Sequence, residues 1–274
     1  MDKIQNFLYK TVPGRFILKP LVQPPITKLG GLILSTRISA LYINKFINNN
    51  RIDMSDYEKR KYRSFNDFFT RTILPDKRPV DAEASSLISP CDSALTIYDI
   101  DENSEFHIKS SVYTASELTG GNTDSYIGGK CLVFRLAVHN YHRYCFIDSG
   151  TAGKSEKIKG VFHTVMPISE EYRVFSQNTR EVTVLHTDNF GDVCQIEVGA
   201  LLVGKISNRE INGRFERGTE KGMFEFGGST IVLLLKKGTA EIRADIIDNS
   251  KNNIETPVKF GEKIGRSCKT SSAE

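Results

Sequence analysis

The stretch Phe224-Glu-Phe-Gly-Gly-Ser-Thr-Ile-Val-Leu-Leu-Leu-Lys236 decides how the rest of the chain is interpreted. Two adjacent glycines, Gly227 and Gly228, interrupt an apolar run and allow turn conformations that other residues resist. The residues from Ile231 to Leu235 then predict a buried strand. One interpretation is a Gly-Gly hairpin that leads into a core strand. The other is a reactive Ser229 that attacks the Gly228 carbonyl, which is easy to approach because Gly228 has no side chain.

The bulk composition is that of a soluble globular protein. The 274 residues suffice for one large domain or for a domain with an N-terminal extension, and 39% of them are hydrophobic and 26% charged. The net charge of +4 is too small to indicate a nucleic-acid partner, but it is compatible with an anionic membrane surface. Neither a signal peptide nor a transmembrane helix is expected, because the best apolar run, residues 29–36, is far shorter than the roughly 20 residues of a span.

The cysteine pattern bears on the redox compartment of the protein and on whether it binds a metal. There are five of them, scattered along the chain and without a C-x-x-C pair. This pattern favours a reducing compartment and argues against a zinc site. No P-loop, G-x-G-x-x-G or H-E-x-x-H motif is present, so cofactor binding through those motifs is not indicated.

Residues 1–80 predict a helical region. Ile38, Leu41, Tyr42 and Phe46 share one face at helical spacing. Basic residues are spread along the same region, namely Lys3, Lys10, Arg15, Lys19, Lys28, Arg37 and Lys45. A basic amphipathic stretch is typical of a helix that lies on a membrane surface, and a helix packed on its own domain is the alternative.

A second helix is expected to begin at Ser64. Ser64 is a good capping residue, Asp67 follows three positions later, and three phenylalanines (Phe65, Phe68 and Phe69) form an apolar face. From about residue 85 the pattern changes to short strands and turns, and residues 181–185 and 193–206 predict a β-pair around a turn at 189–192. We therefore expect an α+β fold, with a helical N-terminal region over 1–80 and a mainly antiparallel β domain over 81–274.

Three side chains could together make a hydroxyl nucleophilic. Asp92 lies among small and apolar residues, His142 lies between Tyr141 and Arg143 in a strand-like run, and Ser229 follows the two glycines. An aspartate, a histidine and a serine are the parts of a catalytic triad. Each also has a structural interpretation: a turn-capping aspartate, a buried structural histidine and a serine in a hairpin. No G-x-S-x-G elbow is present, which argues against an α/β-hydrolase.

Six short motifs, in this order, resemble the phosphatidylserine decarboxylase proenzymes over nearly the whole chain. They are Ser64-Phe-Asn-Asp-Phe-Phe-Thr-Arg71 with Arg78-Pro79, Ser89-Pro-Cys-Asp92, Tyr141-His-Arg143, Val174-Phe-Ser-Gln-Asn-Thr-Arg180, Val198-Gly-Ala200 with Val203-Gly204, and Gly228-Ser-Thr230. The leucine that the family usually has before Gly-Ser-Thr is Gly227 here. The match is specific because six pieces occur in the right order.

The resemblance implies an activity and its cofactor. In this family the bond between Gly228 and Ser229 cuts itself, giving a β chain (1–228) and an α chain (229–274). Ser229 becomes a covalent pyruvoyl group, which forms a Schiff base with phosphatidylserine and accepts electrons while carbon dioxide leaves. The product is phosphatidylethanolamine, and neither an external cofactor nor a metal is implied. Asp92 matches the charge-relay aspartate of the family.

The base of the self-cleavage reaction is the departure from the family pattern. The family commonly has Asp-Tyr-His-x-x-His, whereas this chain has Asn140-Tyr-His-Arg-Tyr-Cys145, so Cys145 replaces the second histidine. Our hypothesis is that His142 serves both self-cleavage and decarboxylation, with His163 as the possible substitute base. Cys145 could act as a base only if its pKa were lowered.

The partners and the location follow from the resemblance. A lipid substrate implies a peripheral enzyme at the cytoplasmic side of the cell membrane, with contact through the N-terminal region. The partners expected are phosphatidylserine and the chain's own two fragments, a heterodimer whose higher oligomeric state is open. The replacement of the histidine by Cys145 motivates one alternative, an uncleaved relative that binds anionic lipid without turnover. A soluble serine hydrolase is another.

Overall fold

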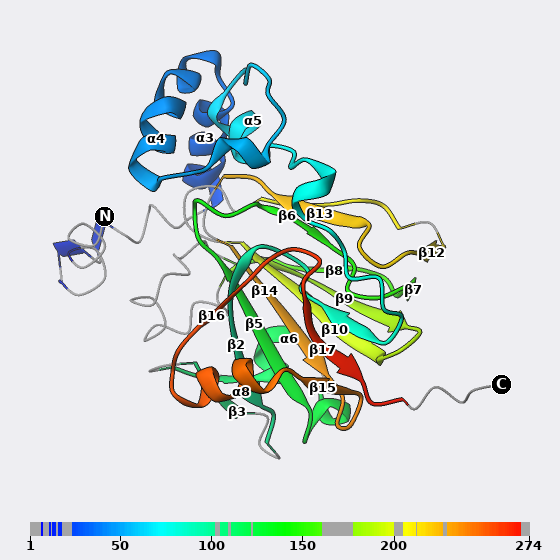
Figure 1. Cartoon of the computed structure of the whole chain (residues 1–274). Coiled ribbons are helices and arrows are strands. Elements are labelled where there is room, and N and C mark those ends of the chain that lie inside the picture. Colours follow the sequence, from blue (N-terminus) through cyan, green and yellow to red (C-terminus); the bar gives the residue numbers. More distant parts are fainter. Residues whose placement is uncertain are drawn as a thin grey trace.

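The computed structural model describes residues 7, 11, 13–14, 16–17, 24–101, 105–108, 111–121, 123–160, 178–199, 205–211, 213–226 and 229–269. Figure 1 shows a body of β-strands with a group of helices at one end. Every described pair of neighbouring strands is antiparallel. The expected mixture of helices and mainly antiparallel sheet is thereby confirmed.

A nine-stranded sheet forms the body. Its order is β12-β7-β9-β10-β14-β5-β2-β16, and β8 pairs with β9. The bounds are β2 Ser93–Asp99, β5 Lys130–Leu136, β7 Gly150–Ala152, β8 Glu156–Ile158, β9 Arg180–Thr187, β10 Gly191–Gly199, β12 Arg214–Phe215, β14 Ser229–Leu235 and β16 Thr256–Val258. The predicted hairpin around residues 189–192 is confirmed as the β9–β10 pair.

Three smaller groups of strands complete the β structure. One sheet has the order β1-β17-β15, another has the order β11-β13-β6, and β3 pairs with β4. The bounds are β1 Ser86–Ile88, β3 Glu105–Ile108, β4 Ser111–Thr114, β6 Arg143–Cys145, β11 Ile206–Asn208, β13 Glu220–Phe224, β15 Ala240–Ile242 and β17 Lys263–Ser267. The helices among these strands are α6 Ala115–Thr119, η4 Asp124–Tyr126 and α8 Ala244–Lys251.

Strand β14 is buried on both faces, which explains its unbroken apolar sequence. Alternate side chains of a strand point to opposite faces of its sheet. Ile231, Leu233 and Leu235 pack in the larger core. Val232 and Leu234 pack in a second core, which includes Leu118 and Ala115 of α6. Because both faces need apolar side chains, β14 has no polar alternation.

A buried ion pair holds the β11-β13-β6 sheet against the body. Lys221 on β13 donates to Glu197 on β10 over 2.7 Å, and neither side chain is more than 1% exposed. Glu197 also accepts a hydrogen bond from Gln195, and Asn208 bridges Glu197 to the Tyr144 hydroxyl. Removing one partner of such a pair would leave an uncompensated buried charge. The pair therefore fixes β13 above the central strands.

The N-terminal helices form a separate layer, at the end of the molecule opposite α8 (Figure 1). Their bounds are α3 Pro24–Leu34, η1 Arg37–Tyr42, α4 Ile43–Asn50, η2 Met54–Asp56, α5 Phe65–Phe69 and η3 Pro75–Lys77. Phe65, Phe68 and Phe69 are buried together with Phe46 of α4, and Phe226 packs against this group. The predicted cap is confirmed, because the Ser64 hydroxyl accepts a hydrogen bond from the Asp67 amide over 3.2 Å.

Two sequence-based expectations are wrong. The Gly-Gly segment is no hairpin, because β13 pairs with β11 and β6 whereas β14 pairs with β10 and β5. The apolar residues on both flanks reflect a passage from one sheet to the other. Nor do Ile38, Leu41, Tyr42 and Phe46 share one face. The chain changes from a 3-10 to an α-helix at residue 43, so Phe46 is buried while Ile38 is 78% and Leu41 84% exposed.

Candidate functional site

Ser229 is the first residue of the central strand β14. It lies opposite Gly199 on β10 and opposite Leu136 on β5, so strands on both sides hold its backbone. Its side chain is fully buried, and its Oγ has no hydrogen-bond partner among the described residues. A buried hydroxyl without a partner is costly for stability. Ser229 is thus a rigidly held hydroxyl without a partner in the described part of the chain, and Gly228 lies outside that part.

His142 is fully buried and offers a free ring nitrogen. Its main-chain oxygen accepts from the Phe224 amide over 2.9 Å, and its ring lies 4.0 Å from that of Phe69. The ring Nδ1 lies 2.9 Å from the Asn140 carbonyl oxygen. A carbonyl only accepts, so Nδ1 carries the proton and Nε2 carries the lone pair. Nε2 has no partner among the described residues.

The surroundings keep His142 neutral. Burial, with the nearby positive charge of Arg71, lowers the pKa of the His142 imidazole to about 3. At neutral pH the ring is therefore uncharged, and its Nε2 is able to accept a proton. A general base is most efficient when its pKa lies near the operating pH, so the pKa of His142 would have to rise from about 3 as the reacting groups come together.

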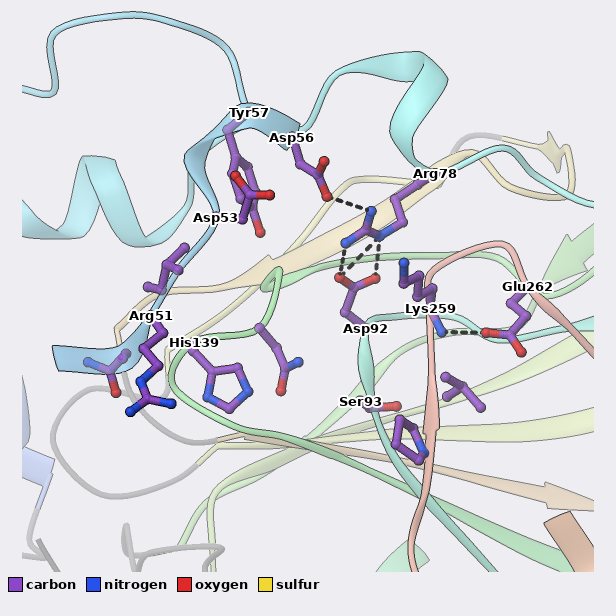
Figure 2. A pocket seen from close by; sticks show the side chains of 15 residues that line it. Arg51, Asp53, Asp56, Tyr57, Arg78, Asp92, Ser93, His139, Lys259 and Glu262 are labelled. Atoms are coloured by element: carbon purple, nitrogen blue, oxygen red, sulfur yellow. Dashed lines mark hydrogen bonds and ion pairs between the residues drawn. The ribbon is translucent and has the colours of Figure 1, made fainter. Parts of the chain in front are cut away.

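Asp92 is paired with Arg78. The Arg78 guanidinium donates to the Asp92 carboxylate through Nε (2.8 and 3.1 Å) and Nη2 (2.7 Å), and the Phe260 amide donates to Oδ1 over 2.9 Å. Figure 2 shows Arg78 also reaching Asp56. Among the described residues, no hydrogen bond joins Asp92 to His142 or to Ser229. The aspartate–histidine relay expected from the sequence is thus not assembled in this structure.

A cavity of about 340 Å³ opens beside Asp92. Figure 2 shows side chains of both charges around it: Arg51, Arg78 and Lys259, and Asp53, Asp56, Asp92 and Glu262. His139 and Asn140 form part of the wall, whereas neither His142 nor Ser229 lines it. A wall with both signs of charge suits a zwitterionic ligand better than a simple anion.

Cys145 is not a base. Its side chain is fully buried, its Sγ lies 3.9 Å from the Ser89 carbonyl oxygen, and burial raises the pKa of its thiol far above the usual range. His139 lines the cavity, and burial lowers the pKa of its imidazole. His163, the substitute base suggested by the sequence, lies outside the described residues. Within the described part of the chain, no group of three or more metal-binding side chains occurs.

Two residues beside the site, Asn66 and Arg71, were not singled out from the sequence. Asn66 accepts a hydrogen bond from the Phe226 amide over 3.0 Å. Arg71 is fully buried and donates to the carbonyl oxygens of His139 and Asn140. Both lie within the Ser64–Arg71 motif, which was the only signal available. An arginine at the end of an apolar helix is the stronger of the two clues, because arginine is rarely buried without a reason.

Comparisons with known proteins agree on one family. The family model described as phosphatidylserine decarboxylase matches residues 65–266. A protein of Clostridium acetobutylicum named phosphatidylserine decarboxylase proenzyme 2 is 51% identical over 264 residues, which cover 95% of this chain and 90% of the relative. Proteins named phosphatidylserine decarboxylase proenzyme from Clostridium botulinum and Clostridium perfringens are 40% and 38% identical, each covering 96% of this chain and 92% of the relative.

Proposed function

This chain belongs to the phosphatidylserine decarboxylase family, and we propose that it converts phosphatidylserine to phosphatidylethanolamine with a pyruvoyl group made from its own Ser229. The observation that carries the proposal is that two buried atoms, the Ser229 hydroxyl oxygen and the His142 Nε2, each have no hydrogen-bond partner among the described residues. One is a nucleophile precursor and the other a neutral proton acceptor.

Self-cleavage would proceed on these groups. His142 Nε2 takes the Ser229 proton, and the Ser229 oxygen attacks the Gly228 carbonyl carbon, which converts the peptide bond into an ester. Elimination of the Gly228 carboxylate, followed by hydrolysis that releases ammonia, leaves a keto group on residue 229. That pyruvoyl group supplies the electron sink for the loss of carbon dioxide. In the structure Asp92 is paired with Arg78, so a relay through Asp92 would require that pair to open.

The two fragments would remain together after the cut. Residues 229–274 supply β14 at the centre of the large sheet, β16 at its edge, and β15 and β17 in a second sheet. Strand β14 is hydrogen-bonded on both sides, and every one of its residues is buried. Separating the fragments would expose both apolar cores, so we infer a stable complex of a β chain (1–228) and an α chain (229–274).

Membrane contact is assigned to the N-terminal helices. Large apolar side chains are exposed on α3 and η1: Leu29, Leu32, Ile33, Ile38 and Leu41. Arg37 and Lys45 are exposed in the same region. Apolar side chains beside cations are the pattern of a surface that enters the lipid interface. From this surface and the lipid substrate we infer peripheral binding at the cytoplasmic face. Among the described helices none has the length and hydropathy to cross a bilayer.

The test is decarboxylation of a defined substrate. Purified protein is mixed with vesicles whose phosphatidylserine carries ¹³C in the serine carboxyl group. The two products measured are ¹³C-labelled carbon dioxide and unlabelled phosphatidylethanolamine. We expect both products from the wild type and neither from Ser229→Ala. The matched control is Ser86→Ala, because the Ser86 Oγ is likewise buried without a partner, but in β1. Vesicle binding by an intact wild-type chain, without product, would instead support the alternative of a lipid-binding relative.

A further inference from the structure

Helix α5 contacts both reacting segments of the proposed self-cleavage. It approaches the residues that precede Ser229 from one side, through Asn66 and Phe69. It approaches the turn that carries His142 from the other, through Phe69 and Arg71. Arg71 lies two residues beyond the end of α5, and the proposed chemistry uses neither the helix nor this arginine.

The contact with the segment before Ser229 is polar and aromatic. The Phe226 amide donates to Asn66 Oδ1 over 3.0 Å, and Asn66 Nδ2 lies 3.4 Å from Glu225 Oε2. The Phe226 ring lies edge-on to Phe65 and Phe69, 4.9 Å from each ring centre. Phe226 is three residues before Ser229. Asn66 therefore fixes the main chain on the N-terminal side of the bond to be cut.

Two arginines link the end of α5 to the turn that carries His142, each donating to main-chain carbonyl oxygens of the other segment. Arg71 Nη2 donates to the carbonyl oxygens of His139 (3.1 Å) and Asn140 (3.3 Å). In return Arg143 donates through Nε and Nη2 to the carbonyl oxygen of Thr70, over 3.1 and 2.9 Å. The Asn140 carbonyl that Arg71 contacts is also the acceptor for His142 Nδ1. Arg71 thus holds the group that sets the His142 tautomer.

Apart from holding this turn, Arg71 has no functional role that the described residues make evident. It is fully buried, its guanidinium lies over the Tyr57 and Phe68 rings, and its Nε and Nη1 have no partner among the described residues. Within the described part of the chain Arg71 donates to the Tyr57 hydroxyl and to two carbonyl oxygens, and to no carboxylate. A buried cation without an anion is unfavourable for folding, so stability alone does not account for it.

From these contacts we propose that α5 and the adjoining Arg71 form the positioning element for self-cleavage: Asn66 and Phe69 hold Phe226, three residues before Ser229, while Arg71 holds the turn that carries His142. The inference rests on the proposed function, since it concerns the same cut. It adds that the N-terminal layer belongs to the cleavage machinery as well as to the membrane contact. Reacting groups misplaced by about 1 Å react up to a hundredfold more slowly, so loosening α5 should slow the cut.

The test follows chain cleavage over time in protein made by cell-free synthesis, with folding checked on each variant in the non-cleaving Ser229→Ala background. We expect Asn66→Ala to slow cleavage about tenfold. Asn66→Asp should also slow it, because the new carboxylate faces Glu225. Adding Glu225→Gln to Asn66→Asp should restore the rate, since the glutamine amide can donate to the aspartate while the aspartate still accepts from Phe226. The matched control, exposed Asn49→Ala on α4, should cleave like the wild type.

A second set of variants in the same cleavage assay tests Arg71. Arg71→Met should slow cleavage, and Arg266→Met is its control, because Arg266 lies exposed on β17, pairs with Glu241 and has no hydrogen bond to α5 among the described residues. The proposal is overturned if folded Asn66→Ala cleaves at the wild-type rate, or if Glu225→Gln gives no rescue. Absence of cleavage in the wild type would instead overturn the proposed function, and this inference with it.

Discussion

The strand that carries Ser229 buries its apolar side chains, whereas the helices at the N-terminal end of the molecule leave several of theirs exposed. All seven residues of β14 are buried, whereas α3 and η1 leave leucines and isoleucines exposed. The first arrangement makes a rigid platform. The second makes a surface that the chain itself does not cover. The helical layer and strand β13, which precedes β14 in the chain, meet at His142, which packs on Phe69 of α5 and accepts a hydrogen bond from the Phe224 amide at the end of β13. The difference indicates that strand β14 holds the nucleophile, Ser229, while the helical layer holds the base, His142.

The largest effect is expected at His142. Replacing His142 by alanine removes the proton acceptor and should slow chain cleavage about 10²–10⁴-fold. The separate variant His163→Ala should cleave at nearly the wild-type rate. Both are scored on a denaturing gel after timed synthesis. Complete cleavage without His142 would rule out its role and would direct attention to His163.

A smaller effect is expected at the exposed helical surface. In the non-cleaving Ser229→Ala background, Ile38→Glu combined with Leu41→Glu should weaken binding to phosphatidylserine vesicles about a hundredfold, roughly 3 kcal/mol for two apolar side chains withheld from lipid. The control is Ile254→Glu, since Ile254 is 53% exposed and follows α8 at the other end of the molecule. Equal loss of binding in the control would mean that charge, and not this surface, governs attachment.

The smallest effect is on stability against pH. Because the pKa of His142 is about 3 in the folded chain against an ordinary 6.5, the unfolded chain binds a proton that the folded chain refuses. The His142 contribution to stability is therefore complete above pH 6.5 and decreases as the pH falls towards 3. Between pH 6.5 and 5 the loss should be about 1.5 kcal/mol. We expect Ser229→Ala to show this decrease, and Ser229→Ala with His142→Phe to lack it, in denaturant unfolding. Parallel pH profiles would contradict the burial of a neutral imidazole.

The sequence predicted what depends on neighbouring residues. The buried run of β14, the β9–β10 hairpin and the Ser64 cap are all local patterns, and each is present. It could not predict the passage between sheets after Phe224, because an apolar flank looks the same whether it pairs with its neighbour or crosses to another layer.

Pairings over longer separations were likewise hidden. The pairing of Asp92 with Arg78 spans 14 residues, and that of Asn66 with Phe226 spans 160. No spacing rule encodes either of them. Exposure of Ile38 and Leu41 was also beyond a periodicity argument, because periodicity identifies an apolar face and not the partner that covers it.

The most direct test of the account is the intact mass of the purified protein. We predict two polypeptides, residues 1–228 and residues 229–274, that elute together under native conditions. The smaller should begin with a keto group and therefore resist amine-directed N-terminal sequencing. A single folded polypeptide of 274 residues, or a cut at any other bond, would contradict the claim that the chain makes its own pyruvoyl group at Ser229.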